Sequence, residues 1–126
     1  MTLPPTRGPS PCVAILAVPG SQLLDVTGPF EIFASAQRDG SPAAAYRVIL
    51  VTPGERSVAT EAGLRLEAHE TIATLDPATI DTLLIAGGPG SRHTPVDGAL
   101  RDWVIATAGL CRRVATVCTG AFLLAR

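Results

Sequence analysis

The segment RVATVCTGAFLL, residues 113–124, decides how this chain folds, because a β-branched run breaks at a cysteine and restarts as a helix. A cysteine at a tight strand-to-helix turn points its sulfur into solvent or a pocket. It also lies over the amino-terminal end of a helix, whose partial positive charge favours the thiolate. We therefore expect Cys118 to be a reactive, pocket-facing thiol. We expect the sharp turn to need Gly120 because glycine has no side chain. The alternative is an ordinary buried cysteine.

Outward from this segment, apolar runs of strand length lie at 12–18, 46–52 and 82–86, each followed by proline and glycine. Continuous apolar runs bounded by turn residues are typical of strands that are buried on both faces of a parallel sheet. Residues 57–68 have the pattern of two short strands around a turn at 61–63. Together with residues 114–117, these runs predict a mainly parallel sheet with one short hairpin.

Two helices are predicted between the strands. The first begins at Thr27 or Gly28 with Pro29 in its first turn, and ends near residues 39–40. The second begins at residues 94–95 and ends at Gly109, with an apolar stripe that includes Trp103. The alternation of strands and helices predicts an α/β sandwich with a mainly parallel central sheet.

Polar and glycine residues follow three of the predicted strands. Asp25 follows the first strand, Gly87, Gly88 and Gly90 follow the strand at 82–86, and Cys118 follows the last one. Ligands of such sheets bind at the carboxyl ends of the strands, so we expect these residues to converge at one edge. The glycines form either a simple turn or a nest of backbone N–H groups for an anion.

Composition limits the classes of function. The 126 residues suit one domain, and 47% hydrophobic residues exclude a disordered chain. A net charge of −1 provides no basic surface for nucleic acid, so we expect no nucleic-acid contact from this segment. No apolar run approaches the roughly 20 residues of a membrane span. We expect residues 1–11, which are proline-rich and polar, to be a flexible leader, and residues 12–126 to form the domain.

The three cysteines are an odd number without CxxC spacing. A disulfide framework or a zinc site is therefore not expected, and neither is a metal or other cofactor. Reduced cysteines fit a cytoplasmic protein best.

Three motifs carry a resemblance to a known family: LDVTGP at 24–29, IAGGPG at 85–90 and VCTG at 117–120. In this order and spacing the chain resembles the ThiJ/PfpI superfamily from residue 12 to residue 126. The resemblance implies a three-layer, flavodoxin-like fold of the class I glutamine amidotransferase type. Within the superfamily, the motifs look like those of isonitrile hydratases and of the N-terminal domains of AraC-type transcriptional regulators. In both groups the domain continues well past the position of Arg126, so the resemblance implies a sheet that is incomplete at the C-terminus.

The resemblance also implies roles for individual residues. Cys118 takes the place of the nucleophile, and Asp25 takes that of the acid that faces it and, when protonated, donates a hydrogen bond to the thiolate. The backbone N–H groups of Gly88 and Thr119 would form an anion or oxyanion site. From the residues alone, Asp25 and Thr119 could equally be helix caps. Peptidases of the superfamily have a histidine directly after the cysteine, and Thr119 in its place argues against peptidase activity.

Two functions of different classes follow from the resemblance. The first is a ligand- or redox-sensing domain of an AraC-type regulator, whose helix-turn-helix part would lie outside this chain. The second is an isonitrile hydratase-like enzyme, in which Cys118, Asp25 and Thr119 act on the substrate and Gly87, Gly88, Gly90 and Gly120 shape the ligand site. In either case the partner is a small-molecule ligand, and the family implies a homodimer.

Overall fold

The computed structural model describes residues 10–37, 43–93 and 98–125. Its strands are β1 (Cys12–Leu16), β2 (Arg47–Thr52), β3 (Ser57–Ala59), β4 (Arg65–Glu67), β5 (Glu70–Thr71), β6 (Thr82–Ile85) and β7 (Arg113–Thr116). Its helices are α1 (Leu23–Ser35), the short 3-10 helix η1 (Pro77–Thr79), α2 (Gly90–His93), α3 (Gly98–Leu110) and α4 (Gly120–Leu124).

Five strands form one parallel sheet in the order β5-β2-β1-β6-β7, and β3 pairs with β4 as a separate antiparallel hairpin. Ala14 of β1 lies between Ile49 of β2 and Leu83 of β6, which fixes the register at the centre of the sheet. Every residue of β1 is buried, as a central parallel strand requires. The mainly parallel sheet and the short hairpin are therefore confirmed.

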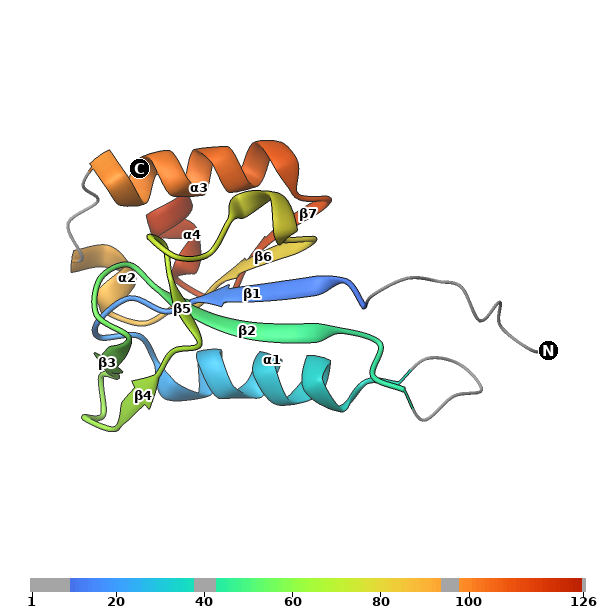
Figure 1. Cartoon of the computed structure of the whole chain (residues 1–126). Coiled ribbons are helices and arrows are strands. Elements are labelled where there is room, and N and C mark those ends of the chain that lie inside the picture. The colour runs from blue at the N-terminus through green and yellow to red at the C-terminus, as the bar shows by residue number, and fades with distance from the viewer. Residues whose placement is uncertain (1–9, 38–42, 94–97, 126) are drawn as a thin grey trace.

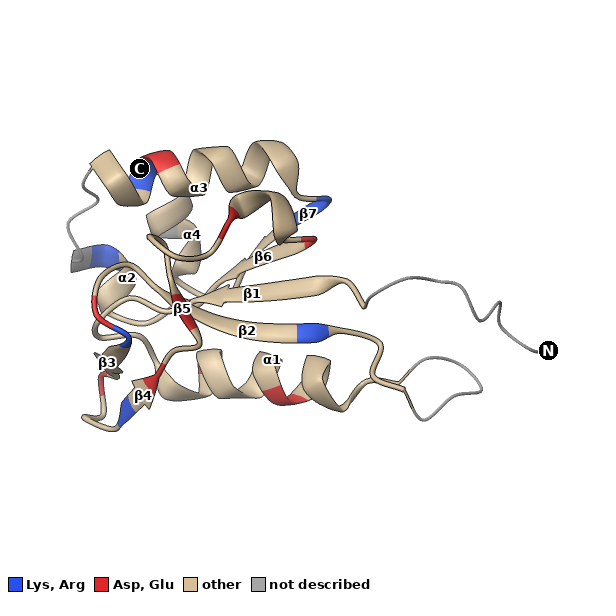
Figure 2. Ribbon diagram, viewed as in Figure 1, with Lys and Arg blue, Asp and Glu red and all other residues tan. Residues whose placement is uncertain are grey.

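Helices cover both faces of this sheet, which gives three layers (Figure 1). Helix α1 packs on one face through Val26 and the partly buried Phe30 and Phe33. Helices α3 and α4 pack on the other face through Leu100, Trp103 and Leu123. Charged residues occur in the loops, the helices and several other strands, but β1 carries none (Figure 2). This is the architecture that the strand and helix order predicted.

The start of α1 differs from the prediction. The helix begins at Leu23, so Pro29 lies inside it and not in its first turn. Proline has no N–H to donate to the carbonyl four residues earlier, here that of Asp25. Val26 is only 2% exposed, and burial of this first turn against the sheet outweighs the lost hydrogen bond. The helix ends at Ser35, and the predicted end at residues 39–40 lies outside the described residues.

Helix α3 buries the apolar face that the sequence predicted. Leu100 and Trp103 are buried, and the Trp103 indole N–H donates to the carbonyl of Leu75 at 3.1 Å. The helix runs to Leu110, one residue past the predicted end, and its predicted start at residues 94–95 lies outside the described part of the chain. Among the described residues, no helix combines the length and the apolar character that a bilayer span requires.

Candidate functional site

Cys118 lies at the turn between β7 and α4, in an unusual backbone conformation. Its φ is 49°, and no other non-glycine residue of the described ranges has a positive φ. Such a left-handed conformation costs roughly 1–2 kcal/mol for a residue with a side chain, so the surrounding structure must hold it. The thiol is free and the residue is exposed. The strand-to-helix turn that the sequence predicted is therefore present.

Gly120 lacks a side chain at a place where the turn has no room for one, as the sequence predicted. It does not have a positive φ, because the strained conformation falls on Cys118 itself. A Cβ atom at Gly120 would instead collide with the backbone carbonyl oxygen of Ile85, at the end of β6. The glycine is needed because α4 begins directly against the end of β6.

An open cavity of about 420 Å³ lies beside Cys118. Its lining combines the start of α1, the loop after β6 with the single turn of α2, and the cysteine turn: Gln22, Asp25, Gly88, Pro89, Arg92, Cys118 and Thr119. Asp25, one glycine of the loop and Cys118 thus meet at the carboxyl end of the sheet, on the left in Figure 1. This convergence is what parallel strand order predicts.

Of the four glycines expected to bind a ligand, Gly88 lines this cavity. Gly87 and Gly90 are buried and allow close packing of backbone segments. A Cβ atom on Gly87 would lie 2.5 Å from the carbonyl oxygen of Val117 and 2.7 Å from the Asp25 carboxylate. One on Gly90 would collide with the carbonyl oxygen of Pro19. Gly87 therefore lets Asp25 and the cysteine turn lie close together, and Gly90 lets the start of α2 lie against the loop after β1.

Asp25 lies in the first turn of α1, where the N-cap residue is Gln22 and makes no side-chain cap hydrogen bond. Asp25 therefore does not occupy the cap position. A Cβ atom on Gly87 would lie within 3 Å of both the Asp25 carboxylate and the backbone nitrogen of Thr119, so the carboxylate lies close to the cysteine turn. Within the described residues, no hydrogen bond joins the Asp25 carboxyl to the Cys118 thiol, although both line the cavity.

The hydroxyl of Thr119 makes an unexpected contact. Thr119 is the N-cap residue of α4, but its side chain makes no cap hydrogen bond. Its oxygen accepts from the backbone N–H of Gly88 at 2.8 Å. The N–H of Gly88, which the resemblance assigned to an anion site, is therefore already hydrogen-bonded within the protein.

Three residues around the site were missed in the sequence. Ser91 is fully buried beneath the Gly88–Thr119 contact, and Gln22 and Arg92 line the cavity. A signal was present, because Ser91 and Arg92 directly follow the glycine loop and Gln22 precedes the LDVTGP motif. The rule that ligand sites gather after strand ends applies to these positions as well.

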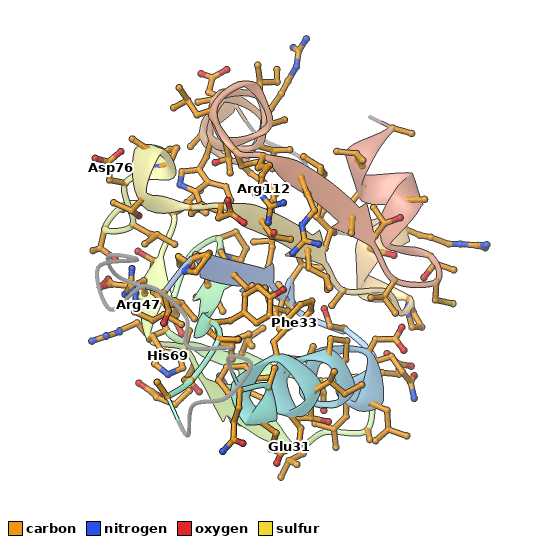
Figure 3. All side chains as sticks on the ribbon, turned by 90° about the vertical axis from the view of Figure 1, so that its right-hand side faces the viewer. Glu31, Phe33, Arg47, His69, Asp76 and Arg112 are labelled. Atoms are coloured by element: carbon orange, nitrogen blue, oxygen red, sulfur yellow. The ribbon has the colours of Figure 1, made fainter. Side chains whose placement is uncertain are left out.

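The opposite, amino-terminal end of the sheet has different chemistry (Figure 3). Arg112 forms a two-point hydrogen-bonded ion pair with Asp81, at 3.0 and 3.1 Å. The hydrogen bond from Arg112 holds the pKa of Asp81 below its usual value. Cys12 is buried there, and burial raises the pKa of its thiol. No group of three or more metal-ligating side chains occurs within the described ranges.

The fold and the cysteine turn define a class, that of parallel α/β domains with a cysteine at a strand-to-helix turn. The family model of the DJ-1/PfpI family matches residues 12–126, and the chain belongs to this family. A ThiJ/PfpI family protein from Pseudomonas syringae has the same fold, with a TM-score of 0.78 and 20% sequence identity. The match covers 98% of this chain and 51% of that one.

Relatives with curated descriptions differ in their functions. An uncharacterized protein in the cpoL 5′ region of Streptomyces lividans is 39% identical over 94% of this chain and 80% of its own length. An HTH-type transcriptional regulator of Mycobacterium tuberculosis is 52% identical over 36% of this chain and 18% of its length. The isonitrile hydratase of Pseudomonas putida is 30% identical over 89% of this chain and 45% of its own length. The chain therefore spans less than half of the hydratase and about half of the Pseudomonas syringae protein.

Proposed function

We propose that this domain is the ligand- or redox-sensing part of an AraC-type transcriptional regulator, in which Cys118 and its cavity receive the signal. A helix-turn-helix region outside these 126 residues would contact DNA. The proposal is supported by the 52% identity to part of a transcriptional regulator, although that match covers 36% of the chain.

One observation of geometry carries the proposal. Cys118 is exposed and strained beside an open cavity, while the neighbouring Gly88 N–H already donates to the Thr119 hydroxyl. Covalent catalysis gains most from backbone donors that are preorganised for the developing charge. A reactive thiol whose nearby donor is occupied is better suited to one modification or binding event than to repeated turnover.

The redox form of the proposal has a defined reaction. The Cys118 thiolate attacks one oxygen of hydrogen peroxide, the O–O bond breaks, and water leaves after protonation of the released hydroxide. The sulfur is oxidised to sulfenic acid and the peroxide is reduced. The new S–OH group would project into the cavity beside Thr119 and Asp25, where it changes the local hydrogen bonding.

The test combines modification with a functional readout. We expect peptide mapping after dilute peroxide to find a gain of one oxygen at Cys118 before Cys12 or Cys111. In the complete gene product, Cys118→Ser should bind DNA in the same way with and without peroxide, whereas the parent protein responds. Cys111→Ser is the matched control, because Cys111 is partly buried and remote from the cavity. A parent protein whose DNA binding ignores both peroxide and candidate ligands would refute the sensor function.

A second candidate is an isonitrile hydratase-like enzyme, because Asp25 and Cys118 line one cavity and the curated hydratase is 30% identical over 112 residues. The Cys118 thiolate would attack the terminal isonitrile carbon, and Asp25, or a water that it positions, would protonate that carbon. Water would then add to the thioimidate carbon, the C–S bond would break, and an N-substituted formamide would leave. Overall, one isonitrile and one water give one formamide.

The two candidates predict different outcomes in one assay. A simple alkyl isonitrile incubated with the protein would yield many equivalents of formamide for the enzyme. For the sensor, the yield would be at most one equivalent. Cys118→Ser would abolish either outcome. Asp25→Asn would slow turnover in the enzyme, but it would leave stoichiometric peroxide oxidation of Cys118 in the sensor.

We further propose a homodimer that works in the cytoplasm. Leu24 and Ile32 on the outer side of α1 are each 71% exposed, which is high for large apolar residues. Light scattering after size exclusion would give twice the 13.0 kDa chain mass for a dimer. A monomer at micromolar concentration would contradict the proposal.

A further inference from the structure

Beneath the cavity lies a small hydrogen-bonded cycle centred on Ser91. Ser91 is 0% exposed, and its Oγ lies 2.7 Å from the carbonyl oxygen of Gly88, 2.9 Å from that of Thr119 and 3.1 Å from Thr119 Oγ1. Thr119 Oγ1 in turn lies 2.8 Å from the Gly88 nitrogen and 3.2 Å from the Gly88 carbonyl oxygen. Ser91 thus ties the loop after β6 to the cysteine turn.

The donors in this cycle are fewer than the acceptors. Each hydroxyl has one proton, so Ser91 can donate to only one of its three neighbours at a time. Whichever arrangement holds, the Gly88 N–H has Thr119 Oγ1 as its acceptor. Ser91 Oγ thus lies next to the Thr119 hydroxyl that accepts from the Gly88 N–H, and both Gly88 and Thr119 line the cavity.

The Gly88 N–H is also held in a fixed direction. The φ of Gly88 is 117°, which favours glycine, and a Cβ atom there would collide with the backbone nitrogen of Gln22. The Gln22 N–H donates to the Gly87 carbonyl at 2.8 Å, and this contact locks the loop against the start of α1. A rigid N–H at a cavity wall is a ready donor for a ligand oxygen once its internal acceptor moves away.

We propose that the Thr119 hydroxyl occupies the position at which a carboxylate oxygen of the ligand binds, and that Ser91 is the positioning residue that sets how readily the ligand displaces it. The inference rests on the proposed function, since it names the ligand class of the same cavity. Arg92 lines the same cavity and provides positive charge for an anionic group.

The experiment reads the Gly88 amide itself. We would titrate the 15N-labelled chain with sodium formate, the smallest carboxylate, and use sodium chloride to keep ionic strength constant. The Gly88 amide signal should shift and saturate with formate. In Ser91→Ala the Thr119 hydroxyl loses one partner, so formate should bind about fivefold more tightly, the factor expected for one hydrogen bond.

Two further variants and one control separate the proposal from alternatives. Thr119→Ala removes the internal acceptor and should bind formate at least as tightly as Ser91→Ala, whereas Thr119→Ser keeps the hydroxyl and should resemble the parent. Thr107→Ala is the matched control, because Thr107 is also fully buried and its hydroxyl donates to Trp103 on α3. It should leave the formate affinity unchanged.

The outcomes that overturn the proposal are specific. If formate leaves the Gly88 amide unshifted in the parent and in Thr119→Ala, the N–H is not a ligand site. If Ser91→Ala and Thr119→Ala both weaken formate binding, the hydroxyl is itself a ligand contact and not an occupant to be displaced. Failure of the sensor function looks different, because the Gly88 amide would then bind formate as expected while DNA binding of the complete protein ignored Cys118.

Discussion

The two ends of the parallel sheet each contain a cysteine, and the two thiols have opposite surroundings. Cys12 lies at the start of β1, 4% exposed, with a pKa raised by burial. Cys118 lies just after β7, exposed, with a φ of 49°. At the amino-terminal end an ordinary ion pair joins Asp81 and Arg112. At the carboxyl end, glycines bring backbone segments into close approach around a cavity.

The difference shows that the reactivity of a thiol in this fold depends on whether it lies within a central strand or directly after one. A residue inside a central strand is enclosed by both helix layers, so its side chain packs and its thiol stays neutral. A residue directly after a strand takes no part in the backbone hydrogen bonds between strands, so its side chain can turn toward solvent. The same side chain is therefore structural at position 12 and available for chemistry at position 118.

The largest expected difference is in alkylation rate. With iodoacetamide at pH 8, Cys118 should react about a thousandfold or more faster than Cys12, because Cys12 reacts only after the core opens. The raised pKa of Cys12 adds to this protection by lowering its thiolate fraction. Time-resolved peptide mapping would measure both rates. If the two alkylation rates were within tenfold of each other, Cys12 would not be protected by burial and the contrast between the two thiols would be wrong.

The close backbone packing at the carboxyl end gives the next largest effect. Gly120→Ala should lower the free energy of unfolding by about 3 kcal/mol, because its Cβ collides with the Ile85 carbonyl oxygen. Gly109→Ala on α3 is the control, since a Cβ there has no neighbour within 4 Å. It should be neutral or stabilise by about 0.5 kcal/mol. Urea denaturation would measure both, and equal effects would contradict the packing argument.

The strain at Cys118 predicts a smaller effect on the free energy of unfolding, and here it is glycine that stabilises relative to alanine. Cys118→Gly should be more stable than Cys118→Ala by about 1 kcal/mol, because glycine adopts a positive φ without steric cost. The same pair of substitutions at Cys111, which lacks a positive φ, should favour alanine. Thermal and urea denaturation of the four variants would test this, and a less stable Cys118→Gly would show that the turn is unstrained.

The ion pair at the amino-terminal end should have the smallest effect. The pKa of Asp81 is lowered in the fold, so its contribution to stability is present above the usual value of 3.8 and disappears as the pH falls through the lowered pKa. The Arg112 side chain is 61% exposed, so solvent and salt screen the pair. Asp81→Asn should cause a slight loss of stability at pH 7 that vanishes at pH 2 or in 1 M salt. A loss that persists under both conditions would contradict an electrostatic origin.

Much of the fold could be predicted because its signals are local. The apolar runs at β1, β2 and β6 and the turn residues after them are visible in the sequence, and so is the apolar face of α3. The start of α1 could not be predicted in this way. Pro29 indicates a helix start, but burial of Val26 against the sheet extends the helix toward Leu23. Very short elements such as β5 and α2 have too few residues for a periodic pattern.

Some features of the candidate site could likewise be predicted from the sequence, and others could not. The positions of Asp25, Gly88 and Cys118 after strands predicted that they would meet, and they line one cavity. The contact between the Thr119 hydroxyl and the Gly88 N–H was not predictable, since these residues are 31 positions apart. Nor was the buried hydroxyl of Ser91, because serine in a glycine loop normally indicates an exposed turn.

The sequence by itself determined the family, the parallel sheet and the position of the cysteine at the end of a strand, because periodicity, turn residues and ordered motifs are properties of the chain. Only the tertiary structure decided which backbone N–H groups remain available, which glycines pack and which line the cavity, and that the positive φ falls on Cys118 and not on Gly120. These depend on ångström-scale contacts between segments distant in sequence, and such contacts are set by how β6, β7 and α1 pack together.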